Sequence, residues 1–226
     1  MRMRRVVGAA AAAALVAALA IPAAASPPSS YHEQYSFTGT IAQADWFSEE
    51  EPDVGEIGAV FVMGADATQV IRVAGSKPVR SPQPSVVALS MRVSDEEPGY
   101  AELWCLSEDA DFVISDDLTE ATLALECTGE FVVYNPDTGE EIPTGETLDL
   151  TVSASWTGVG ELFRQKSHSR ESFDGQWSMY RSRATVRDAT AEVTITSPDA
   201  TLFDGTMMWA QMLHVRDAGL FHATMR

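Results

Sequence analysis

The sequence predicts an all-β protein, an antiparallel β-sandwich or a partly open barrel of about 10–12 strands with one disulfide. Two observations support this fold class: apolar and polar residues alternate along most of the chain, and two cysteines follow a segment typical of exported proteins. The residues from Leu148 to Trp156 show the alternation most clearly. Further alternating runs occupy residues 35–46, 57–63, 87–93, 100–106, 121–127 and 191–195.

The first 25 residues resemble a secretory signal in their charge and hydropathy pattern. A cationic segment, Met1–Arg5, precedes the apolar run Val6–Ile21, and Ala23–Ala25 forms an A-x-A cleavage site before Ser26. We therefore expect a secreted protein, extracellular or associated with the cell envelope, that keeps no membrane span once the signal is removed. The predicted organisation is a signal peptide (1–25), a flexible N-terminal segment (26–34) and one β-sandwich domain (35–226), with two smaller β units as the alternative.

Cys105 and Cys127 are the two cysteines of the chain. Export sends them to an oxidising compartment, where an even number of cysteines favours a disulfide. Neither residue has a C-x-x-C partner or a nearby His, so a catalytic thiol or a metal site is the weaker interpretation. We expect a Cys105–Cys127 bond.

Four regions fit the strand pattern less well. Residues 47–56 and 74–85 are rich in Pro, Gly and charge and are predicted to be surface loops, and Asn135–Gly139 has the composition of a hairpin turn. The segment 207–215 fits either a strand or a short helix. We favour a strand, followed by a turn at Arg216–Gly219 and a last strand to Thr224.

The chain is strongly acidic. Its formal net charge is −18, which becomes −21 when Arg2, Arg4 and Arg5 leave with the signal. Such a charge repels nucleic acid at long range, so nucleic-acid binding is excluded as a general function.

No motif of the sequence indicates catalysis, a metal or a cofactor. The four His residues lack metal-ligand spacing, the acidic runs lack the spacing of a calcium loop, and no G-x-S-x-G motif is present. The five Trp residues fit a packed core better than a sugar-binding platform. A secreted hydrolase without a recognisable motif and a structural envelope protein remain alternatives to a non-enzymatic binding module.

Basic residues gather in one segment of this acidic chain. Between Glu161 and Arg187 lie six Lys and Arg residues against three acids. Arg164, Lys166, His168 and Arg170 are two residues apart and so share one face of a strand, as do Arg181, Arg183 and Arg187 on the next.

Asp174–Gly175 between the two runs is a hairpin signal. If these two residues form the turn, Lys166 lies opposite Arg183 and His168 opposite Arg181, which places both basic runs on one face. That face is predicted either to be neutralised by acidic side chains or to bind an anionic polysaccharide, a phosphate-bearing wall polymer or an acidic protein surface. The candidate ligand-binding residues are Arg164, Lys166, His168, Arg170, Arg181 and Arg183.

Overall fold

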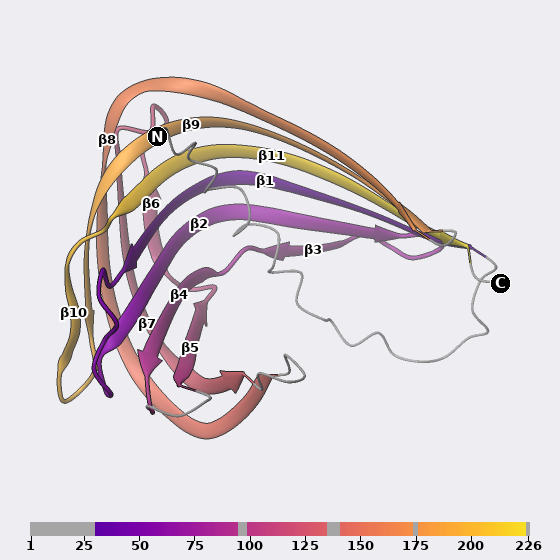
Figure 1. Ribbon diagram of the computed structural model, residues 1–226. Helices are drawn as coiled ribbons and strands as arrows, with labels where there is room; N and C mark the ends of the chain where they lie inside the picture. Colours follow the sequence, from indigo (N-terminus) through magenta and orange to yellow (C-terminus); the bar gives the residue numbers. More distant parts are fainter. Residues whose placement is uncertain (1–29, 95–98, 135–140, 174–175, 225–226) are drawn as a thin grey trace, which may run out of the picture.

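The computed structural model describes residues 30–94, 99–134, 141–173 and 176–224, and it shows the predicted antiparallel all-β fold with no helix in these ranges (Figure 1). The predicted signal peptide and the predicted turns at 135–139 and 174–175 lie outside the described residues. The strands are β1 (Ser30–Phe47), β2 (Ile57–Val73), β3 (Val79–Pro82), β4 (Ser85–Arg92), β5 (Tyr100–Ser107), β6 (Asp111–Ile114), β7 (Glu120–Tyr134), β8 (Glu141–Phe173), β9 (Gln176–Thr196), β10 (Thr201–Thr206) and β11 (Trp209–Thr224).

Strand pairing closes on itself and forms a barrel. Neighbouring strands follow the order β1-β11-β9-β8-β7-β5-β4-β2, and β2 pairs again with β1. The short strands β3, β6 and β10 pair with β2, β7 and β9 outside this ring. Of the two predicted architectures, the barrel therefore describes the arrangement.

The barrel interior is filled by the residues that the alternating pattern marked as apolar. On β8, Leu150, Val152, Ala154 and Trp156 are all buried, and the Trp156 indole N–H donates to the carbonyl oxygen of Gln43 at 3.2 Å. Alternate residues of all eight strands of the ring contribute to the same cluster. The strict alternation follows from the strand geometry, because successive side chains point to opposite faces.

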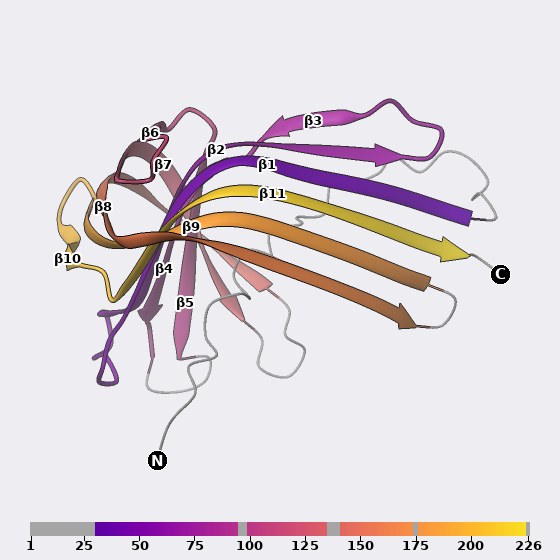
Figure 2. The same cartoon turned by 90° about the horizontal axis from the view of Figure 1, so that it is seen from above.

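Five long strands continue beyond the barrel as a flat extension, which we call the arm. Figure 2 shows β2, β1, β11, β9 and β8 lying side by side as they leave the barrel, with β3 next to β2 at one edge. β1 and β11 pair from Ser30↔Thr224 to Asp45↔Trp209 without a register shift. The arm comprises residues 30–40, 64–73, 79–82, 163–173, 176–186 and 214–224.

The arm has two different faces, because paired residues of antiparallel strands point to the same side. One face carries a second apolar cluster where the arm meets the outside of the barrel. This cluster is distinct from the barrel interior and includes the partly buried Trp104. Its buried members are Ile41, Met63, Val86, Ala184, Val186, Leu213 and Val215.

The predicted disulfide is confirmed between Cys105 on β5 and Cys127 on β7, with the two Cα atoms 5.9 Å apart. The two strands pair from Ala101↔Val133 to Trp104↔Glu130, just before the bond. Cys105 is fully buried in the barrel interior. The disulfide therefore fastens the two strands next to the end of their ladder.

Several boundaries differ from the sequence prediction. β1 begins at Ser30, so residues 30–34 of the predicted N-terminal segment belong to a strand, which pairs with β11 and, from Glu33, also with β2. The predicted loop 74–85 contains β3. The segment 209–215 is a strand as favoured, but the turn predicted at 216–219 is wrong, because β11 runs unbroken to Thr224.

The turn at 216–219 was predicted because a glycine in a polar stretch, here Gly219, usually marks a turn. In the structure Gly219 is buried inside β11, where a Cβ atom would overlap the ring of Tyr35. The glycine therefore allows a close approach between strands. Gly160 is required for its backbone conformation instead. Its φ of 71° falls in the left-handed region, at the register shift where β8 leaves the barrel.

Candidate functional site

The predicted basic hairpin has the expected register. Lys166 pairs with Arg183 and His168 pairs with Arg181, and the last pair before the turn is Phe173↔Gln176. Arg164 and Arg170 lie on the same side of β8, so the six candidate residues share one face of the arm. Their placement together is confirmed, and their role in binding remains a prediction.

A seventh basic residue lies on the same face, although its place in the sequence did not predict this. Arg216 of β11 pairs with Arg183, so Lys166, Arg183 and Arg216 form a row of three cations across three neighbouring strands. The row of three cations was not predicted, because Arg216 was expected to lie in a turn, where a residue has no cross-strand neighbour. We call the seven residues the basic cluster: Arg164, Lys166, His168, Arg170, Arg181, Arg183 and Arg216.

The charges of the arm are separated by face. Following the register across β11, β1, β2 and β3 places Arg72 and Arg80 on the same side as the basic cluster, beyond the uncharged Thr38 and Thr68. One acid, Asp66, falls on this face among the described residues. Eight of the 15 Lys and Arg residues of the chain thus share one face: Arg72, Arg80, Arg164, Lys166, Arg170, Arg181, Arg183 and Arg216.

The basic cluster is exposed to solvent, and no acid among the described residues forms a salt bridge with it. All seven side chains are exposed. The salt bridge found in the described part of the chain joins Arg92 to Glu51, and no member of the cluster forms one there. Arg170 has an aromatic contact, with its guanidinium carbon 6.0 Å from the centre of the Trp177 ring. The expected neutralisation by neighbouring acids is therefore not found within the described residues.

Polar contacts on the other face hold the same strands together. The Tyr180 hydroxyl on β9 donates to an Asp217 carboxylate oxygen on β11 at 2.7 Å, and the Tyr35 ring stacks on Tyr180 with centroids 6.2 Å apart. Burial, followed by the bond to Asp217, raises the pKa of Tyr180 to about 12. Asp217 follows Arg216 in sequence, yet it points away from the basic cluster and does not neutralise it.

Two further basic side chains stand where the arm joins the barrel. His214 is half-buried, and one of its ring nitrogens lies 2.8 Å from the carbonyl oxygen of Asp116 in the turn before β7. Arg187 was grouped with Arg181 and Arg183 from its spacing. It pairs with the buried Met212 and is half-buried itself, so it does not belong to the exposed cluster.

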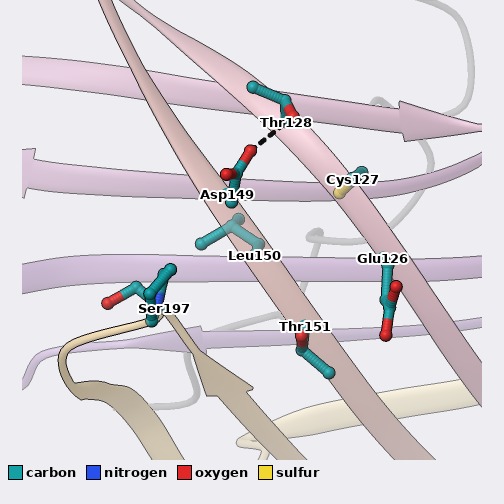
Figure 3. Close-up of a pocket in the computed structure, with 8 residues that line it drawn as sticks. Glu126, Cys127, Thr128, Asp149, Leu150, Thr151 and Ser197 are labelled. Atoms are coloured by element: carbon teal, nitrogen blue, oxygen red, sulfur yellow. Dashed lines mark hydrogen bonds between the residues drawn. The ribbon is translucent and has the colours of Figure 1, made fainter.

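A shallow hollow on the outer wall of the barrel is the other candidate site. Figure 3 shows Glu126 and Thr128 of β7 beside Asp149 and Thr151 of β8, with Ser197 at one end. The Thr128 hydroxyl donates to Asp149 at 2.6 Å. A glycosidase needs two carboxyl groups that face each other across the scissile bond. Glu126 and Asp149 instead project from adjacent strands of one outward wall, so the hollow gives no support to the hydrolase alternative.

The described residues contain no group of three or more His, Cys, Asp and Glu side chains arranged to hold a metal ion. No helix in the part of the chain that the structure covers is long and apolar enough to cross a membrane. Comparison with protein-family models and with curated proteins finds no match.

Proposed function

We propose that this protein is an exported, non-enzymatic binding module whose basic cluster binds an anionic polymer, such as a carboxylated or sulfated glycan or a phosphate-bearing wall polymer. The observation that carries the proposal is the concentration of six Lys and Arg residues in the exposed basic cluster of a chain with a formal net charge of −18. Like charges on directly opposed residues destabilise a sheet. A cationic row that forms no ion pair with the described residues is therefore costly for folding, and a bound anion would offset that cost.

The spacing of the cluster favours a polymer over a small anion. Neighbouring strands lie about 4.8 Å apart, and alternate residues on one strand lie about 6.6 Å apart. From Arg164 to Arg170 the cluster therefore extends for about 20 Å along β8, while Lys166, Arg183 and Arg216 extend it across three strands. A small anion would contact two or three of these side chains. A chain with repeated negative charges would contact most of them.

The residue types suit carboxylate, sulfate and phosphate groups. Five of the seven members of the basic cluster are Arg, whose planar guanidinium group donates two parallel hydrogen bonds to such anions. The hydroxyl groups of Thr38 and Thr68 extend the same face beyond Arg216 and add uncharged donors and acceptors. A glycan that carries both anionic and hydroxyl groups would match this combination.

The test is binding of the purified protein to immobilised dextran sulfate and polygalacturonate, with neutral dextran as the uncharged matrix. Replacing Lys166 and Arg183 together with Ser should weaken binding by about tenfold to thirtyfold, since each cation near an anionic surface contributes about 1 kcal/mol. Binding should also weaken as salt increases.

The matched control replaces Arg72 and Arg80 with Ser. This variant loses the same charge from the same face, but outside the basic cluster, so its binding should change by less than about threefold. Equal losses in both double variants would show that only the overall charge matters. Unchanged binding in the Lys166→Ser/Arg183→Ser variant would refute the proposed site.

A further inference from the structure

Among the described residues, the arm has a long edge along β8 without a neighbouring strand. β7 pairs with β8 only up to Thr157, and from Phe163 to Phe173 β8 pairs with β9 alone among the described residues. Figure 2 shows this part of β8 at the border of the arm. The strand at the other border, β3, is four residues long. Within the part of the chain that the structure describes, the β8 edge is therefore the longer unpaired edge of the arm.

An unpaired edge presents backbone N–H and C=O groups that can pair with another strand. Proteins usually protect such edges with charged side chains, proline, a bulge or a covering segment, and of these the β8 edge of the arm has, among the described residues, only the charges. The stretch from Arg164 to Arg170 contains no proline, pairs with β9 without a register shift and is exposed at every residue. Its remaining positions are the small or polar residues Gln165, Ser167 and Ser169. Backbone pairing is therefore sterically open along this stretch.

Charge determines which strands the edge can accept. Two β8 edges that paired with their basic sides on the same face would oppose Arg and Lys side chains, which is unfavourable. A strand with carboxylates at alternate positions would instead place an acid beside Arg164, Lys166 and Arg170. The basic residues thus act against self-pairing and favour an acidic partner.

We propose that the β8 edge binds an extended acidic segment of a partner protein as an added strand. Backbone hydrogen bonds to the edge supply part of the affinity, and carboxylates at every second position of the segment contact the basic side of β8. This interaction goes beyond the polymer proposal, because it requires an ordered peptide backbone as well as charge. Either interaction can exist without the other.

The test uses fluorescence anisotropy with a labelled peptide of about ten residues that alternates Glu and Thr. Two further peptides carry N-methyl groups on one or the other alternate set of backbone nitrogens. Only one set of N–H groups points toward the edge in an added strand. We therefore expect one methylated peptide to bind like the parent and the other to bind at least about tenfold more weakly. If both methylated peptides bind as well as the parent, charge attraction alone acts and the strand-addition proposal is wrong.

Charge reversal in the protein locates the edge that is used. Lys166→Glu should weaken binding of the alternating Glu-Thr peptide by at least about tenfold. A Lys-Thr peptide should bind neither form of the protein, because the five Arg residues of the basic cluster remain. Arg80→Glu, which makes the same charge change on β3 at the other border, should leave both peptides nearly unaffected. Equal effects of the two variants would contradict binding at β8. Circular dichroism of both variants checks that the β structure is retained.

Discussion

The row Lys166–Arg183–Arg216 predicts that removing its central charge stabilises the fold. Arg183 has a cation directly opposite on each side, on β8 and on β11. Each like-charge pair of this kind destabilises a sheet by about 0.2–1 kcal/mol, so Arg183→Thr should raise the free energy of unfolding by roughly 0.4–2 kcal/mol at low salt. For a domain of this size the midpoint of thermal unfolding should rise by about 1–8 °C.

The assay is thermal unfolding followed by circular dichroism at low ionic strength and again in 1 M salt. At 1 M the screening length is about 3 Å, so the gain of the variant should largely disappear. Arg80→Thr is the matched control: Arg80 lies on the same face but pairs with Val70, so its removal should relieve no repulsion. A stability loss in Arg183→Thr at low salt, or a gain that persists in high salt, would refute the repulsion argument.

Two further predictions concern the barrel. Replacing both Cys105 and Cys127 with Ala should lower the free energy of unfolding by about 3 kcal/mol, because the disulfide closes a loop between two residues that are 22 positions apart. Two alkylatable thiols in the purified protein would contradict the presence of this disulfide. Burial raises the pKa of Asp45 to about 6. Ionisation of this carboxyl group therefore costs more free energy in the folded state than in the unfolded state, and its contribution to stability falls as the pH rises from about 4 to 6. Asp45→Asn should therefore stabilise the protein in chemical denaturation at pH 7.5 and not below pH 4; an equal gain at both pH values would rule out ionisation as the cause.

The local pattern of the sequence was sufficient for most of the barrel strands and for the register of the basic hairpin. Alternation from Leu148 to Trp156 identified the side of β8 that faces the barrel interior. The spacing of the two basic runs around Asp174–Gly175 was enough to obtain the Lys166↔Arg183 pairing, because a hairpin register depends on the turn alone.

The pattern did not reveal contacts between distant segments. Arg216 is 33 positions from Arg183 in sequence, and no local signal shows that they are opposite each other. The closure between β1 and β2 and the open edge of β8 likewise depend on which strands become neighbours. Gly219 shows the same limit: its role is to make room for Tyr35, a residue far away in the chain, and the sequence alone suggested a turn.

The unbroken ladder between β1 and β11 affects how the arm would respond to a pulling force. Both strands pass from the barrel wall to the far end of the arm without a register shift, so no irregularity interrupts this ladder between the barrel and the arm. Hydrogen bonds between antiparallel strands lie perpendicular to the strand direction. A force applied along the arm would therefore shear many hydrogen bonds at once instead of opening them one after another. An anchored polymer that pulled in this direction would meet the greatest mechanical resistance that the sheet offers.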